Sequence, residues 1–124
     1  KIKHRESFRP FAPSILEEYV SEYFDIDRSS PYMLMVTRGK KPDKIPAVTH
    51  VDGTCRLQTV NRNANPIYYD LINEFYKITG VPVVINTSMN VMSEPIVNTP
   101  KQAYQMIVKT DMDYLVMGNY LVRK

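Results

Sequence analysis

A chain of 124 residues with 44% hydrophobic and 23% charged residues has the length and composition of one globular domain, and we expect residues 1–124 to form it. No apolar run approaches the ~20 residues that cross a bilayer, and no leader-like segment is visible, which predicts a protein outside the membrane. The single cysteine, Cys55, cannot form an internal disulfide, which favours a cytoplasmic setting. The net charge of +3 favours an anionic ligand over a surface that coats nucleic acid.

The first residues of the chain carry alternating cations. Lys1, Lys3 and Arg5 would lie on one side of an extended backbone, and Arg9 follows closely. Such a row could bind an anion. Many terminal runs of charge are simply solvated tails, and that alternative stays open. The aromatic residues and prolines within positions 8–13 favour a segment that is docked on the protein.

The next part of the chain predicts a helix, a strand and a loop. Ser14-Ile15-Leu16-Glu17 has the form of a capping box, and the apolar residues that follow predict a helix ending near Asp25. Residues 32–37 form an apolar run typical of a strand. Residues 38–44 are basic and contain Gly and Pro, which predicts a loop.

A hairpin is predicted around Asp52-Gly53, because this pair lies between two alternating segments, 46–51 and 54–60. In that register Arg56 lies on the polar face and is a candidate ligand of phosphate. Cys55 lies on the apolar face, and nothing nearby in the sequence would activate its thiol.

Two further helices are predicted in the second half of the chain. Asn65-Pro66 opens the first helix and Gly80 closes it. Asn98-Thr99-Pro100 caps the second, and Gly118-Asn119 lies between two apolar segments that predict a final hairpin. The buried face of the first helix is expected to hold Ile67, Tyr68, Leu71, Ile72, Phe75 and Ile78.

A short apolar run, residues 81–85, leads into a group of small polar residues. The run is typical of a buried strand, and ligands often bind where such strands end. Hydroxyl and amide side chains there can bind phosphate or carboxylate oxygens. The residues concerned are Asn86, Thr87, Ser88 and Asn90. A turn capped by the same residues is an equally simple interpretation.

Residues 3–14, 49–58, 86–90 and 94–97 resemble motifs of the C-terminal domain of the NodU/CmcH-type O-carbamoyltransferases, in the same order and with similar spacing. Met89 and Ser93 stand where that family usually has Phe and Gly. The resemblance implies a YrdC-like α/β fold, in which helices flank a twisted mixed β-sheet. It also implies a tetrad of Lys3, Arg5, Ser88 and Asn90 as the catalytic residues. Further candidate ligands of the nucleotide and phosphates are Lys1, Arg9, Arg56, Asn86 and Thr87.

The chemistry implied by the resemblance joins carbamoyl phosphate and ATP, with Mg²⁺, into carbamoyl-adenylate. A separate N-terminal ASKHA-type domain of the same polypeptide would pass the carbamoyl group to an acceptor hydroxyl, and iron is expected only in that domain. We therefore expect the chain to be a fragment of a longer protein and to hold no metal site of its own. Two alternatives stay open: a non-catalytic module that binds nucleotides or RNA, and a purely structural interaction domain.

Overall fold

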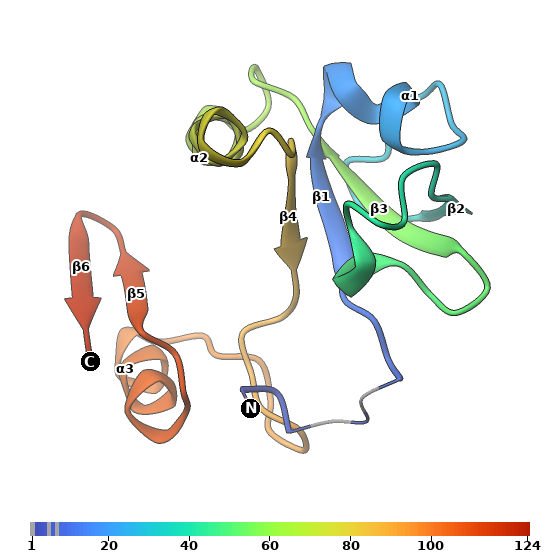
Figure 1. The fold of residues 1–124 in the computed structure, drawn as a ribbon. Coiled ribbons are helices and arrows are strands. Elements are labelled where there is room, and N and C mark those ends of the chain that lie inside the picture. The colour runs from blue at the N-terminus through green and yellow to red at the C-terminus, as the bar shows by residue number, and fades with distance from the viewer. Residues whose placement is uncertain (1, 5, 7) are drawn as a thin grey trace. The chain divides into compact units, whose positions relative to one another are not determined.

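Figure 1 shows the computed structural model of the chain, which describes residues 2–4, 6 and 8–124. The chain forms two compact units. One comprises residues 7–87, and the other joins residues 1–6 to residues 88–124. The basic N-terminal segment therefore belongs with the C-terminal third of the sequence.

The unit of residues 7–87 is built on a mixed four-stranded sheet (Figure 1). Its strands are β1 (Ala12–Leu16), β2 (Met35–Arg38), β3 (Thr54–Val60) and β4 (Val83–Asn86), in the order β2-β3-β1-β4. The pair β1 and β3 is parallel, and the other two pairs are antiparallel. The sheet and its helices confirm the predicted mixed α/β class.

Strand β1 overturns the helix predicted from Ser14 to Asp25. Ile15 and Leu16 are both fully buried, because they point to opposite faces of the sheet and each face is covered. A strand covered on both faces carries a continuous apolar run, which by itself resembles one side of a helix. Only the residues after β1 are helical, in a 3-10 helix and a single turn of α-helix, α1: Glu17–Tyr19 and Val20–Tyr23.

The turn at Asp52-Gly53 is present, but the hairpin predicted around it is wrong. The Gly53 N–H donates to His50 O at 2.9 Å, which closes a tight turn. The segment before the turn contains a 3-10 helix, Pro46–Val48, in place of a strand. Strand β3 pairs with β2 and β1 instead, and its alternation is as predicted: Cys55 is buried and Arg56 is exposed.

Helix α2 (Pro66–Thr79) begins and ends where the sequence predicts. The Asn65 side chain accepts a hydrogen bond from the Tyr68 N–H, and Gly80 ends the helix with φ of 70°, a conformation that favours glycine. Ile72 is buried against Leu16 and Val60 on one face of the sheet. Four residues predicted to share that buried face are exposed instead: Ile67, Leu71, Phe75 and Ile78.

The second unit contains helix α3 (Pro100–Lys109) and a hairpin of strands β5 (Tyr114–Met117) and β6 (Tyr120–Arg123). A capping box starts α3, because the Thr99 side chain accepts from the Gln102 N–H while Gln102 Oε1 accepts from the Thr99 N–H. The small core of this unit consists of Ala103, Ile107 and Leu115.

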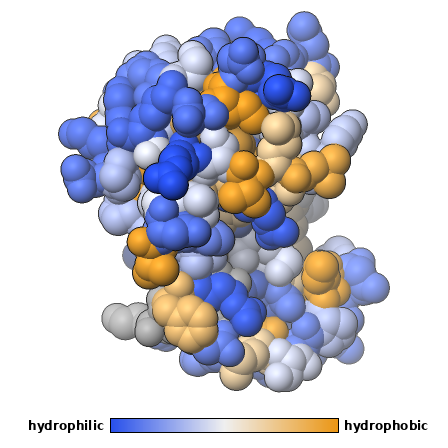
Figure 2. Space-filling model, turned by 90° about the vertical axis from the view of Figure 1, so that its right-hand side faces the viewer, coloured by the Kyte–Doolittle hydropathy of each residue, from blue (hydrophilic) through white to orange (hydrophobic). Residues whose placement is uncertain are grey.

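Figure 2 shows the side of the chain that carries β2 and β3, where hydrophilic residues dominate and hydrophobic ones form separate patches. Single exposed apolar residues such as Val36 on β2 are normal for a protein surface. Among the described residues, none of the helices combines the length and the apolar character needed to cross a bilayer.

Candidate functional site

The structure brings together three members of the predicted tetrad, Lys3, Ser88 and Asn90. Lys3 Nζ donates to Ser88 O at 2.5 Å and to Asn90 Oδ1 at 2.8 Å, and Ser88 Oγ lies 3.4 Å away. All three residues belong to the unit of residues 1–6 and 88–124. We refer to them as the Lys3 cluster.

Asn90 has a fixed orientation in the Lys3 cluster. Its side-chain oxygen accepts from Ser88 Oγ at 2.7 Å as well as from Lys3, while its Nδ2 donates to Glu94 O at 2.9 Å. Because both ends of the amide have partners, the oxygen is turned toward the ammonium group. The cluster is therefore held in one arrangement by its own hydrogen bonds.

Backbone contacts hold the loop that carries this cluster. The Met92 N–H donates to Lys3 O at 3.1 Å, which ties the N-terminal segment to the loop, and the Val97 N–H donates to Met89 O at 2.9 Å. Ser93 has φ of 67°, in the left-handed region that favours glycine. Glycine would adopt this conformation with less strain than serine.

The Lys3 cluster is chemically suited to bind an anion. The oxygens of Ser88 and Asn90 that accept hydrogen bonds from Lys3 Nζ are neutral, so the cluster joins an ammonium group to uncharged polar groups. The Ser88 side chain is exposed, which leaves it within reach of a ligand. A hydroxyl can donate to a phosphate or carboxylate oxygen, and a hydrogen bond to such a charged group contributes about 1.5–3 kcal/mol.

A second polar group lies on the four-stranded sheet, where Gln58 joins strands β1 and β4. Gln58 Oε1 accepts from Ser14 Oγ at 2.8 Å and from Asn86 Nδ2 at 2.7 Å, and Gln58 Nε2 donates to Pro31 O at 3.0 Å. Ser14 is fully buried, so this hydrogen bond satisfies a hydroxyl that water does not reach. By strand alternation Arg56 lies on the same face of the sheet as Gln58.

Sequence reasoning missed the roles of Ser14 and Gln58. Ser14 was assigned to a helix cap, and its contact with Gln58 depends on the parallel pairing of β1 and β3, in which the two residues are partners. The only indication in the sequence was the alternation of polar Arg56 and Gln58 with buried Cys55 and Leu57. That pattern identifies a polar face but not the strand beside it.

The remaining site predictions have different outcomes. Arg9, Arg56, Asn86 and Thr87 belong to the unit of residues 7–87, and their convergence with the Lys3 cluster stays a prediction. Asn86 contacts Gln58, while Arg9, Arg56 and Thr87 are exposed. Lys1 and Arg5 lie outside the described residues.

Cys55 is unsuited to act as a nucleophile. The side chain is fully buried, and burial raises the pKa of its thiol, although a hydrogen bond to Thr49 Oγ1 acts in the opposite direction. In the part of the chain that the structure describes, no group of three or more His, Cys, Asp or Glu residues could hold a metal ion.

Comparison with known proteins identifies the family of the chain. Residues 1–124 match the family model described as carbamoyltransferase C-terminus. Nodulation protein NolO of Bradyrhizobium diazoefficiens is 50% identical over 128 residues, which cover 99% of this chain and 23% of that protein. An uncharacterized protein of Synechocystis is 44% identical, with 100% of this chain and 24% of that protein covered. Nodulation protein U of Rhizobium tropici is 45% identical over 92 residues, which cover 73% of this chain and 16% of that protein.

The chain thus spans about a quarter or less of the length of these relatives. The family model nevertheless covers every residue of the chain, and the relatives include NodU-type proteins, so the resemblance seen in the sequence motifs is confirmed. The chain belongs to the carbamoyltransferase C-terminus family.

Proposed function

We propose that this chain is the part of an O-carbamoyltransferase that binds ATP and carbamoyl phosphate and forms carbamoyl-adenylate for transfer to an acceptor hydroxyl. The observation that carries the proposal is the Lys3 cluster, in which an ammonium group, a hydroxyl and an oriented amide converge. Membership in the carbamoyltransferase C-terminus family supports the same reaction class.

In the proposed reaction, carbamoyl phosphate, ATP and water give carbamoyl-adenylate, pyrophosphate and phosphate. Water first cleaves the acyl-phosphate linkage of carbamoyl phosphate, which releases phosphate and leaves carbamate. A carbamate oxygen then bonds to the α-phosphorus of ATP, while the bond from that phosphorus to the pyrophosphate oxygen breaks and pyrophosphate leaves. Negative charge shifts among the phosphate oxygens during this step. A positioned cation stabilises the changing charge, so no covalent enzyme intermediate is needed.

Lys3 would bind a phosphate oxygen. Ser88 would donate to the same group by exchanging its hydrogen bond to Asn90 Oδ1 for one to the phosphate. One such contact contributes about 1.5–3 kcal/mol, whereas micromolar binding needs about 8 kcal/mol. Further ligands are therefore required, and Arg5 is the first candidate because a guanidinium can bind phosphate through two parallel hydrogen bonds. Lys1, Arg9, Arg56, Asn86 and Thr87 are the other proposed ligands.

The proposal also includes a metal ion and a further domain. Mg²⁺ usually keeps several waters and binds nucleotides through their phosphates, so it would arrive with ATP and need few protein ligands. The N-terminal ASKHA-type domain of the same polypeptide, with the expected iron, would carry out transfer to the acceptor. A cytoplasmic setting, which the single cysteine favours, is part of the same proposal.

The test uses the longer polypeptide and measures carbamoyl-adenylate by mass spectrometry, together with pyrophosphate release that depends on carbamoyl phosphate. We expect Asn90→Ala to lower the rate at least about tenfold, the effect of losing about 1.4 kcal/mol of binding to the reacting groups. Asn98→Ala is the matched control, because Asn98 is exposed in the same unit and lies outside the Lys3 cluster. Equal rates in the two variants, or no pyrophosphate release by the unmodified protein, would overturn the proposal.

A non-catalytic RNA-binding module is the second candidate, favoured only by the cationic N-terminal segment. Binding that neutralises many phosphates weakens steeply as salt rises, and it shows no preference for a triphosphate. Measuring the affinities for ATP and for an RNA oligomer across a salt series separates the two functions. Tight, salt-sensitive RNA binding without ATP binding would favour the second candidate.

A further inference from the structure

Helix α2 carries a continuous apolar stripe beside the face that packs on the sheet. The stripe consists of Ile67, Leu71, Phe75 and Ile78, whose spacing of four, four and three residues places them on one face of a helix. Their exposed fractions are 83%, 55%, 39% and 84%. The helix packs on the sheet through Ile72, on the adjacent face, and the four side chains of the stripe stay exposed beside this contact.

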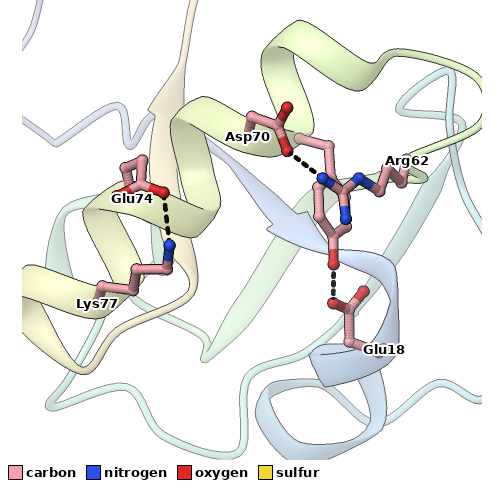
Figure 3. A network of polar contacts seen from close by, with 6 residues as sticks. Glu18, Arg62, Asp70, Glu74 and Lys77 are labelled. Atoms are coloured by element: carbon pink, nitrogen blue, oxygen red, sulfur yellow. Dashed lines mark hydrogen bonds and ion pairs between the residues drawn. The ribbon is translucent and has the colours of Figure 1, made fainter.

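The polar residues of α2 leave this stripe open. Figure 3 shows that Asp70 pairs with Arg62 and that Glu74 pairs with Lys77, along one flank of the helix. The Tyr69 hydroxyl donates to Glu18, which lies in the 3-10 helix that follows β1. These contacts satisfy the charged groups among themselves, and none of them covers the four apolar side chains.

A cavity of about 200 Å³ adjoins the stripe at Phe75. Its walls come from α2, β4 and the segment around the 3-10 helix Pro46–Val48, and most of them are apolar: the residues include Phe75, Pro46, Val81, Val83 and Ile85. Ile85 is itself half exposed on β4, an outer strand of the sheet. The stripe and the cavity therefore form one apolar surface within the unit of residues 7–87.

We propose that this surface is covered by a part of the longer polypeptide that lies outside residues 1–124. Apolar patches of more than a few hundred Å² are rare on free surfaces and mark interfaces. The surface area of four side chains is smaller than the ~800 Å² that each partner buries in a stable association of separate proteins. A covalently linked segment needs less area, because its effective concentration reaches the millimolar range.

The length of the relatives supports a partner within the same polypeptide. The chain spans only 16–24% of the length of the curated relatives that it matches, so those proteins have several hundred further residues. At roughly 100–200 residues per domain, that length is enough for at least one further domain, which could supply the partner surface. Because the surface is apolar, we expect the segment that covers it to be apolar as well and to carry few charged groups. The inference does not depend on the reaction proposed above.

The test compares two neighbouring cysteine substitutions in the longer polypeptide, Ile78→Cys and Lys77→Cys. In this chain both positions are open, since the Lys77 side chain is 60% exposed and Ile78 is 84% exposed. We expect a maleimide to label Ile78→Cys at least about tenfold more slowly than Lys77→Cys, because the reagent reaches a covered residue only in locally opened molecules. Mass spectrometry of the labelled peptide separates this thiol from all others.

Ile67→Cys, at the other end of the stripe, provides a second measurement in case one variant does not fold. A photoreactive side chain at position 78 should then crosslink to a peptide outside residues 1–124 of the same molecule. Equally fast labelling at positions 67, 77 and 78 would overturn the proposal, and so would a crosslink from position 78 to residues 88–124 of the same molecule. A crosslink that joins two molecules, with protection that disappears on dilution, would also overturn it and would identify a second copy as the partner.

Discussion

Lys3 Nζ lies 2.8 Å from Asn90 Oδ1, although 87 positions separate the two residues in the sequence. Side-chain contacts therefore join the N-terminal segment to the loop after β4, and Lys3 is the charged member of the Lys3 cluster. Removing its charge should affect anion binding without removing any apolar group from the core. The first prediction follows from this relationship.

Lys3→Met should weaken ATP binding by a factor of roughly 10 to 150 in the longer polypeptide, the equivalent of one charge-assisted hydrogen bond of about 1.5–3 kcal/mol. Lys3→Arg should retain part of the affinity, because it keeps the charge but cannot place a compact ammonium between Ser88 and Asn90. Titration calorimetry measures both. Lys101→Met, which removes an exposed lysine from α3 in the same unit, should leave binding unchanged; an equal loss there would mean that net charge alone matters.

Two substitutions, one within β4 and one just after it, distinguish an effect on the proposed reaction from an effect on folding stability. Ser88→Ala should lower carbamoyl-adenylate formation strongly and change the free energy of unfolding by about 1 kcal/mol or less, since Ser88 is exposed. Val83→Ala should do the reverse and cost roughly 2 kcal/mol, because Val83 is buried in the core and the smaller side chain leaves a cavity. Urea unfolding and the adenylate assay measure the two effects.

The interpretation that Ser88 merely caps a turn makes a different prediction for the same pair. In that case Ser88→Ala would destabilise the loop while the folded fraction kept its activity. The hydrogen bond from Ser88 Oγ to Asn90 Oδ1 fits either role, so the activity per folded molecule is the measurement that decides.

The sequence predicts a structural feature well when the residues that determine the feature are close together in the chain. The ends of α2 follow from Asn65 and Gly80, each of which acts on its own turn of backbone, and both ends are confirmed. The predicted buried face of α2 is right for Ile72 and Tyr68, which pack on the sheet. It is wrong for the four residues of the apolar stripe, which are exposed. Periodicity shows that a face is apolar, but not what covers it.

Strand β1 and the candidate site show the same limit. Ser14 was misread because the pairing of β1 with β3 and β4 overrides local helix preference. The meeting of Lys3 with Ser88 and Asn90 was expected only from the family resemblance, since no local rule joins residues so far apart. The contact of Ser14 with Gln58 depends on strand register, which neither pattern nor resemblance supplied.

Ser93→Gly should be tolerated and should stabilise the loop of the Lys3 cluster. Ser93 has φ of 67°, and a side chain in this region costs about 1 kcal/mol, which glycine avoids. Glycine also makes the unfolded chain more flexible, so the net gain should stay below about 1 kcal/mol. Ser29→Gly is the control, because Ser29 is exposed and is not among the residues with positive φ; it should destabilise slightly in urea unfolding. Destabilisation of similar size at both positions would contradict the strain at Ser93.

The last prediction concerns Gln58, which holds Asn86 and Ser14 together on the sheet. Gln58→Leu should cost about 1–3 kcal/mol of unfolding free energy, because it leaves the buried Ser14 hydroxyl without an acceptor. Gln58→Glu keeps an oxygen that can accept from Ser14 and Asn86 but loses the donor to Pro31 O, so its cost should be smaller. Urea unfolding at neutral pH measures the two costs, and we expect the larger loss of unfolding free energy in Gln58→Leu.

A double-mutant cycle with Ser14→Ala shows whether the hydrogen bond itself is responsible. Once the Ser14 hydroxyl is absent, Gln58→Leu should cost less than it does alone, since it no longer leaves the buried Ser14 donor without an acceptor. The two costs would simply add if Gln58 acted only through packing. Because Asn86 is two residues before Ser88 and bonds the same Gln58 oxygen, Gln58→Leu should also lower carbamoyl-adenylate formation per folded molecule, whereas Ser14→Ala should affect it less. An unchanged rate in folded Gln58→Leu would restrict the role of Gln58 to stability.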